Sequence, residues 1–276
     1  MKIALCLHGY IKNAEGNNAI KKSFEYIENK LIKKFNVDVF CHSWDISNQN
    51  TYENMYGKIS KNAKFENQIN FKDFDICKNQ SWFDLGFDRQ STMYHSNIIE
   101  RHLSFLYSRN EAIKMAINYS NENNFNYDSI IVGRFDLGTR GKSTPQKYYA
   151  TNFNFFEKSD MSNIHFAFWD QFNHGLPDHW FYGDSSCIEK VGNLYDNIFK
   201  YYQIDSEYVE NVTNGWFDSN SNNEFSNEMF KDRKDKSSNL VKWPKWHCID
   251  NHKTYKWHLL KVNKMAFKTV DITKDY

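Results

Sequence analysis

The chain has 276 residues, of which 40% are hydrophobic and 17% aromatic, so it can bury a sizeable core as a globular protein. Its 35 Lys and Arg residues balance 34 Asp and Glu residues, and the net charge of +1 gives no overall field that would attract nucleic acid or an anionic membrane. The length fits one large α/β domain, and we expect a single domain over residues 1–276.

The spacing of the cysteines and the first ten residues indicate the cellular compartment in which we expect the protein. The five cysteines show no CxxC pair or other zinc-binding spacing, and their odd number argues against a disulfide framework. The start, MKIALCLHGY, has one basic residue and an apolar run too short for a signal peptide. No stretch of about 18 apolar residues occurs in the sequence. We therefore expect a cytoplasmic protein with reduced thiols that does not span a membrane.

The predicted elements begin with a strand, a helix and a second strand. Residues 3–7 form a short apolar run, and apolar residues then recur at helical spacing over residues 20–35. Residues 37–40 indicate a second short strand, which ends in the polar and aromatic stretch 42–45. Because the loops of a βαβ unit converge at the carboxyl ends of its strands, we expect ligand-binding residues at both strand ends.

The middle of the chain has a less regular pattern. Residues 46–91 are polar and aromatic without a sustained period, and we expect an irregular insertion with short elements of undefined position there. A long helix is predicted from Ser96 to the NENNFN turn signal, and it leads into the buried strand of the segment YDSIIVGRFDLG at residues 127–138. A turn at residues 175–177 then precedes a short aromatic strand at residues 180–182.

The last third contains a predicted helix and an aromatic-rich end. Ser186 and Glu189 have the spacing of a capping box at the start of a helix whose apolar face runs to Ile198. The stretch KWPKWHCIDNHKTYKWHLLK interleaves Lys with Trp and His. It fits an irregular packing segment with its lysines facing water. The alternatives are a membrane-interface patch, a lid over a ligand and a nucleic-acid surface.

Four stretches, in this order, resemble bacterial and viral glycosyltransferases that build capsule, lipopolysaccharide or other surface glycans: KIALCLHGYIKN, VDVFCHSWD, YDSIIVGRFDL and LPDHWFYGDSSCIEKVGNLYDN. The resemblance covers roughly residues 1–200. It implies a GT-A-like α/β/α sandwich with a mostly parallel central sheet. Residues 1–140 would be the nucleotide-binding half, and residues 141–276 the acceptor-side half with the irregular C-terminal segment.

The resemblance also implies the substrates. The enzyme would be hexosyltransferase-like, would use a nucleotide-sugar donor and would transfer the sugar to a glycan or a lipid-linked acceptor. A lipid-linked acceptor would bring the cytoplasmic protein into peripheral contact with the membrane surface. Because the net charge is close to zero, we expect no nucleic-acid partner. Enzymes of this class usually hold Mn²⁺ or Mg²⁺ through a D-x-D motif.

The segment that corresponds to D-x-D reads Arg134-Phe135-Asp136 in this chain. The resemblance implies that Asp136 holds the cation and that Arg134 contacts the phosphates, where negative charge grows as the donor bond breaks. The motif supplies one carboxylate where D-x-D supplies two, so metal dependence stays open. The alternative is that the two side chains pair with each other or cap neighbouring loops.

The resemblance places the nucleotide at the ends of the first two strands, against His8, Gly9, Tyr10, Asn13, Trp44 and Asp45. Gly9 would let the backbone approach the ligand closely, Trp44 would stack on the base, and Asp45 would accept hydrogen bonds from the ribose. The alternatives are a tight turn at Gly9 and a core tryptophan at position 44. His8 and His42 also fit structural histidines, because no third ligand has metal-binding spacing.

Asp178 and His179 are the candidate catalytic bases. In the resembled family an acidic residue of this region faces the acceptor, so Asp178 would deprotonate the acceptor hydroxyl in an inverting reaction, with His179 as the competing base. A retaining enzyme would need no base there, and an Asp that forms an Asx hydrogen bond in a turn is the alternative. Asp170 and Asp184 are lesser candidates for the base. A non-catalytic α/β protein that binds a sugar or a nucleotide is the alternative function.

Overall fold

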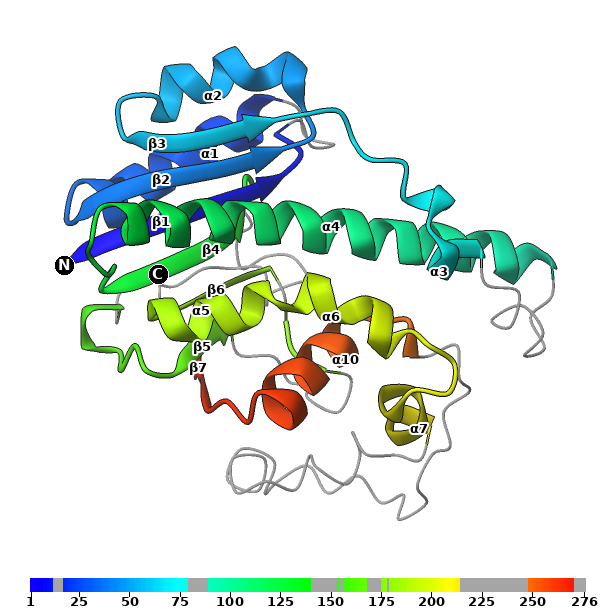
Figure 1. Ribbon diagram of the computed structural model, residues 1–276. Helices are drawn as coiled ribbons and strands as arrows, with labels where there is room; N and C mark the ends of the chain where they lie inside the picture. Colours follow the sequence, from blue (N-terminus) through cyan, green and yellow to red (C-terminus); the bar gives the residue numbers. More distant parts are fainter. Residues whose placement is uncertain are drawn as a thin grey trace.

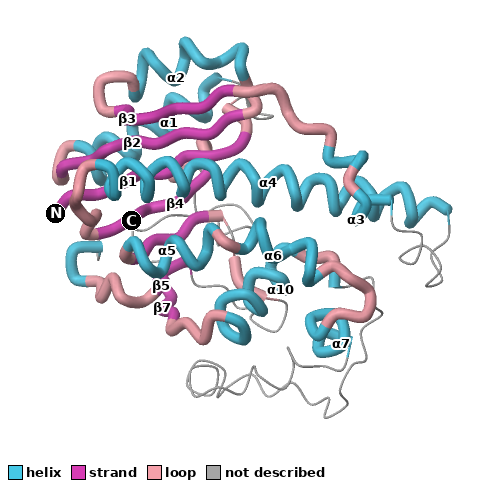
Figure 2. The backbone as a smooth tube through the Cα atoms, viewed as in Figure 1, coloured by secondary structure: helices cyan, strands magenta, loops and turns pink. Residues whose placement is uncertain are grey.

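The computed structural model describes residues 1–11, 17–78, 89–139, 153, 156–167, 175–177, 179–213 and 248–270. Within these ranges seven strands form one sheet in the order β3-β2-β1-β4-β6-β5-β7. Figure 2 shows the strands in magenta, with helices beside them. The strand bounds are β1 Lys2–Gly9, β2 Asn36–Ser43, β3 Ser60–Phe65, β4 Ser129–Arg134, β5 Ile164–Ala167, β6 Trp180–Gly183 and β7 Phe267–Val270. Among these strands β6 alone runs opposite to the others. The expected α/β class with a mostly parallel central sheet is therefore confirmed.

Helices make up the rest of the regular structure that is described, and α4 runs across one face of the sheet (Figure 1). The α-helices of the described residues are α1 Asn17–Ile27, α2 Gln49–Tyr56, α3 Asp75–Lys78, α4 Arg89–Glu122, α5 Ser185–Gly192, α6 Leu194–Tyr201, α7 Glu207–Thr213 and α10 Asn251–Lys256. The π-helical turns η1 Glu28–Ile32 and η10 Trp257–Val262 extend α1 and α10, and the short 3₁₀ segments are η2 Ile46–Asn48, η3 Phe71–Asp73 and η6 Phe156–Lys158. Across the described ranges, no helix has both the length and the apolar composition that a bilayer crossing requires.

The interior strand β1 separates two hydrophobic cores. Because successive side chains of a strand point to opposite faces, Ala4 and Cys6 pack toward α4, whereas Leu5 and Leu7 pack toward α1. All four side chains are fully buried, which explains the continuous apolar run that predicted this strand. Helices thus cover both faces of the sheet. The carboxyl ends of its parallel strands lie together at one edge.

Residues 46–91 were expected to be an irregular insertion with short elements, and the described part of this range is more regular than expected. Helix α2 and strand β3 lie in that region, and β3 pairs in parallel with β2 at the edge of the sheet. The sequence of β3 is SKNAKF, and its side chains are exposed or half-buried. An edge strand with so little burial has no apolar alternation, so its sequence carries no strand signal.

The described part of the C-terminal segment, from residue 248, also differs from the expectation of irregular packing. Residues 251–262 form α10 and its π-helical extension, and β7 then adds a strand beside β5. Lys253 and Lys256, expected on a wet face, are each only 3% exposed. Lysine within an interleaved aromatic pattern therefore did not mark the solvent side.

The predicted capping box before α5 is not formed as expected. Asp184 is the N-cap residue, and its carboxylate accepts a hydrogen bond of 2.7 Å from the Cys187 backbone N–H. Ser186 lies inside the first turn and is exposed. The predicted single helix is also interrupted at Asn193, which separates α5 from α6. Asp184, a lesser candidate for the catalytic base, thus has a local structural role.

Candidate functional site

A pocket of about 370 Å³ opens at the carboxyl ends of β1, β2 and β4. The chain moves outward from β1 to β2 and β3 and then returns to place β4 on the other side of β1. Such a reversal of strand order leaves a crevice at the carboxyl edge of the sheet, because the connections diverge to the two sides. The pocket lies at this position, and six of the predicted site residues line it: His8, Gly9, Tyr10, Trp44, Arg134 and Asp136.

Gly9 forms the end of β1 and part of the pocket wall. Its φ of +99° lies in the region that favours glycine, and a Cβ built on it would meet no atom within 4 Å. The backbone N–H of Gly9 donates to Ser108 Oγ of α4 over 2.9 Å. The backbone is therefore anchored on the helix side while its Cα borders open space, where a ligand can approach it closely.

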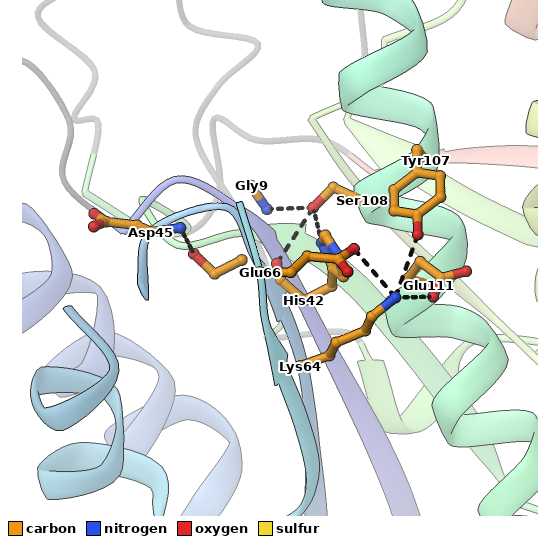
Figure 3. A network of polar contacts seen from close by, with 9 residues as sticks. Gly9, His42, Asp45, Lys64, Glu66, Tyr107, Ser108 and Glu111 are labelled. Atoms are coloured by element: carbon orange, nitrogen blue, oxygen red, sulfur yellow. Dashed lines mark hydrogen bonds and ion pairs between the residues drawn. The ribbon is translucent and has the colours of Figure 1, made fainter. Parts of the chain in front are cut away.

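A buried network connects Gly9 to the neighbouring strands (Figure 3). The two His42 ring nitrogens have different partners: Nδ1 lies 2.8 Å from Ser108 Oγ, and Nε2 lies 2.9 Å from Glu66 Oε1. An ionised carboxylate can only accept, so the proton of neutral His42 is on Nε2. Nδ1 then accepts from the Ser108 hydroxyl, whose oxygen accepts from Gly9. The network orders the end of β1 and uses His42 as a structural residue.

Lys64 extends this network along the edge of the sheet. Its Nζ lies 3.1 Å from Glu66, 3.0 Å from Glu111 and 3.3 Å from the Tyr107 hydroxyl. Burial lowers the pKa of His42, and the hydrogen bond to Glu66 offsets only part of this effect. Burial would raise the pKa of Glu66, but hydrogen bonds from His42 and Lys64 outweigh it and lower the pKa. The pair is thus a neutral imidazole beside a carboxylate.

Trp44 and Asp45 differ from the roles that the resemblance implied. Trp44 is 5% exposed, and its ring stacks on Tyr107 with centroids 5.2 Å apart, so it cannot offer an open ring face to a base in this conformation. Its indole N–H has no hydrogen-bond partner in the described part of the chain. The Asp45 carboxylate accepts from Ser47 Oγ over 2.7 Å and from Asn48 Nδ2 over 2.8 Å. Asp45 therefore orders the turn into η2 and does not line the pocket.

Tyr10 joins the loop after β1 to two other walls of the pocket. It is 50% exposed, and its hydroxyl donates to Gln68 Oε1 in the segment after β3. Gln68 Nε2 in turn donates to Ser104 Oγ of α4 over 3.2 Å. Burial, followed by the negative charge of Asp45, raises the pKa of the Tyr10 phenol, which stays neutral. Tyr10 is thus the exposed aromatic surface of this site.

Arg134 and Asp136 form an ion pair, with 2.6 Å between Arg134 Nη2 and Asp136 Oδ2. Their side chains are 35% and 15% exposed, and both face the pocket. A divalent cation usually needs several oxygen ligands. In the described ranges no three His, Cys, Asp or Glu side chains come together as a metal site. The described residues around Asp136 therefore do not fit a bound cation, because its carboxylate is engaged by a guanidinium.

The pocket also contains residues that the sequence did not indicate. Arg101, Ser104 and Phe105 of α4 form one wall, and Gln68 completes it. The His8 ring, only 1% exposed, packs edge-on against Phe105 with centroids 5.0 Å apart. Together with Ser108, these helix residues occupy positions i, i+3, i+4 and i+7, which share one helix face. Their spacing in the sequence is a signal that could have indicated a common wall. Gln68 had no signal, since β3 was not predicted.

His179 does not line this pocket. It precedes β6, where Trp180 pairs with Gly133, so it lies at the same edge of the sheet as Arg134. Its ring centroid is 6.3 Å from that of His252, whose Nδ1 lies 2.8 Å from the Leu176 carbonyl oxygen. Asn13, Asp170 and Asp178 lie outside the described residues.

Comparisons of the chain with protein-family models, with curated proteins and with solved structures find no match.

Proposed function

We propose that the protein is a glycosyltransferase with a GT-A-like fold. It would move a sugar of the hexose type from a nucleotide-sugar donor to a glycan or a lipid-linked acceptor in surface-polysaccharide synthesis. The observation that supports this proposal is the pocket. Three stretches that resemble such enzymes, at residues 2–13, 37–45 and 127–137, all contribute residues to its wall.

The chemistry of the wall fits a phosphorylated, polyhydroxylated ligand. Two guanidinium groups, of Arg101 and Arg134, face the pocket, and guanidinium geometry matches phosphate oxygens. Gly9 gives the ligand close access to the backbone, and Tyr10 offers an exposed ring on which a base can stack. Asp136 is the one carboxylate in the described wall, so the site does not repel an anion strongly.

In the proposed reaction an acceptor hydroxyl oxygen attacks the anomeric carbon of the donor sugar. The bond from that carbon to the diphosphate oxygen breaks, and the diphosphate leaves with the bonding electron pair. Arginine donors at the pocket stabilise the charge that develops on the leaving group. The hydroxyl proton passes to a base, for which Asp178 and His179 are the candidates. No step is assigned to a metal ion, because the described residues do not fit one.

A second candidate is a non-catalytic protein that binds a sugar or a nucleotide. The observation that favours it is the 2.6 Å pairing of Asp136 with Arg134, since a paired carboxylate is a weak base. The described wall of the pocket contains no other carboxylate.

Calorimetric titration with UDP, GDP, CDP, ADP, dTDP and CMP, with and without Mn²⁺, tests the proposal. We expect one of these nucleotides to bind, and at a hundred times its Kd it should raise the free energy of unfolding by about 2.7 kcal/mol. Incubation with the matching nucleotide-sugars then separates the two candidates, because a transferase releases the nucleotide and a binding protein does not. Absence of binding to all six nucleotides would contradict the transferase and the nucleotide-binding protein, and would leave only a sugar-binding protein.

A further inference from the structure

The charged groups of the pocket are not equivalent. Arg134 is paired with Asp136 over 2.6 Å, so an anion placed at that guanidinium also meets a carboxylate. Arg101 lies on the helix wall, is exposed, and has no hydrogen-bond or ion-pair partner within the described ranges. The two charges of an ion pair largely cancel for an anion placed beside both, whereas an uncompensated guanidinium attracts it. An anionic ligand is therefore stabilised more at Arg101 than at the neutral pair.

Ser104 strengthens the anion-binding character of the helix wall. It follows Arg101 by three residues on α4, so the two side chains share a face of the helix. Ser104 Oγ accepts a hydrogen bond of 3.2 Å from Gln68, which leaves the hydroxyl hydrogen able to donate. A guanidinium and a hydroxyl that both donate suit phosphate oxygens, which only accept.

The Arg134–Asp136 pair presents a different chemistry to the ligand. The carboxylate accepts hydrogen bonds and the guanidinium donates them, and the short contact holds the two groups in a fixed relation. Each hydroxyl of a sugar both donates and accepts, and it carries no charge that would disturb the pair. Neighbouring sugar hydroxyls are therefore better partners for this pair than a diphosphate is.

We infer that the pocket has two subsites: Arg101 and Ser104 of α4 bind the diphosphate of the donor, and the Arg134–Asp136 pair binds hydroxyls of its sugar. This inference rests on the proposed function, because it divides a nucleotide-sugar between two walls of one pocket. It moves the phosphate contact from the strand end, where the resemblance implied it, to the helix wall. It also makes Asp136 a sugar-recognition residue.

Three probes test the division by calorimetry: inorganic pyrophosphate, the tightest-binding nucleoside diphosphate of the six-nucleotide panel, and a hexose donor of the same nucleoside. Each is titrated in EDTA and again in Mn²⁺. The variants are Arg101→Gln, Arg101→Lys, Arg134→Gln and Asp136→Asn. Lys114→Gln is the control, because it removes one positive charge from the same helix at a residue that does not line the pocket. Melting temperatures of all variants check that each is folded.

We expect Arg101→Gln to weaken binding of all three probes by about tenfold or more, since charge-assisted hydrogen bonds to phosphate are lost. Arg101→Lys should recover part of the affinity, and Lys114→Gln should have little effect. Asp136→Asn should leave pyrophosphate affinity within about threefold or raise it, because a repelling charge is removed. Arg134→Gln leaves the Asp136 carboxylate unpaired, so it should weaken pyrophosphate binding somewhat, but less than Arg101→Gln does. Asp136→Asn and Arg134→Gln should both abolish the additional affinity of the nucleotide-sugar over the nucleoside diphosphate.

Other results would overturn the inference. If Arg134→Gln weakens pyrophosphate binding more than Arg101→Gln, the diphosphate lies at the strand end. If Asp136→Asn removes a Mn²⁺-dependent gain in affinity, Asp136 is a metal ligand and not a sugar contact. A wild-type protein that transfers sugar while Arg101→Gln binds every probe normally would contradict the inference and leave the proposed function standing. Pyrophosphate binding through Arg101 without binding of any nucleotide would support the anion subsite and overturn the proposed function.

Discussion

Gly9 is the residue at which the backbone itself forms the pocket wall. Its positive φ follows from the end of β1, where the chain must turn away from the sheet while its N–H stays bonded to Ser108. Any other residue would adopt this φ with strain, and its side chain would project into open space at the pocket. Conformation and access to the ligand therefore both require glycine at this position.

We expect Gly9→Ala to lower the free energy of unfolding by about 1–2 kcal/mol, because an L-residue is strained at this φ. Gly9→Met should cost a similar amount of stability but should weaken nucleotide binding further, since its longer side chain fills the pocket. Thermal unfolding and calorimetric titration of the two variants measure these effects separately. Equal nucleotide affinity in Gly9→Met and the wild type would show that ligands do not approach this residue.

The first turn of helix α5 is stabilised by an N-cap residue. The Asp184 carboxylate caps it by accepting from Cys187 N–H, which satisfies one of the backbone donors that a helix start leaves unpaired. The predicted cap at Ser186 had the right spacing but lies two residues too late. β6 ends at Gly183, and the helix begins as soon as the strand leaves the sheet. The boundary is therefore determined by the strand that precedes the helix.

Asp184→Ala should lower the free energy of unfolding by about 1 kcal/mol, the usual cost of removing an N-cap side chain. Ser186→Ala, at an exposed position of the first turn, should change it by less than about 0.5 kcal/mol. Urea unfolding of both variants gives the comparison, and nucleotide affinity should be unchanged in each. A larger loss for Ser186→Ala than for Asp184→Ala would contradict the assignment of the cap.

At the scale of the whole molecule, buried neutral histidines connect elements that are far apart in the sequence. His258 of the π-helical turn lies 2.7 Å from the Lys190 carbonyl oxygen of α5 and 2.8 Å from the Tyr201 hydroxyl of α6. Burial, with a contribution from the positive charge of Arg109, lowers the pKa of His258 to about 4. Burial also lowers the pKa of His42. Packing of the C-terminal helix thus depends on an uncharged imidazole.

These shifts predict that the protein loses stability in acid. Below the unfolded-state pKa of about 6.5, the histidines of the unfolded chain bind protons that the folded histidines do not. The free energy of unfolding therefore decreases as the pH decreases. For His258 the loss runs from about pH 6.5 down to its folded pKa of about 4. Each such histidine contributes at most about 1.4 kcal/mol per pH unit.

His258→Gln should therefore flatten the dependence of stability on pH between about 6.5 and 4, even if the variant is less stable throughout. Urea unfolding at a series of pH values measures the two curves. Carboxylates titrate in both proteins alike, so the difference between the curves isolates His258. Parallel curves for the variant and the wild type would show that this imidazole titrates normally.

The sequence by itself determined the elements that are buried on a regular period. The βαβ unit of β1, α1 and β2, the long helix α4 and the strand β4 were all predicted, because apolar spacing reports which side of an element faces the core. It also determined that residues after β1, β2 and β4 would meet, since the carboxyl ends of parallel strands share one edge of a sheet.

Only the tertiary structure decided the rest of the site. The edge strand β3 has no apolar pattern, so its pairing with β2 depends on a neighbour and not on its own sequence. Arg101 reaches the pocket because α4 crosses the sheet beside β1, and Ser108 bonds to Gly9 across 99 positions of sequence. Local patterns report burial, whereas the partner of a polar side chain depends on which distant segment packs against it. The chemistry of the pocket wall therefore could be described only from the tertiary structure, in which α4 packs beside the strand ends.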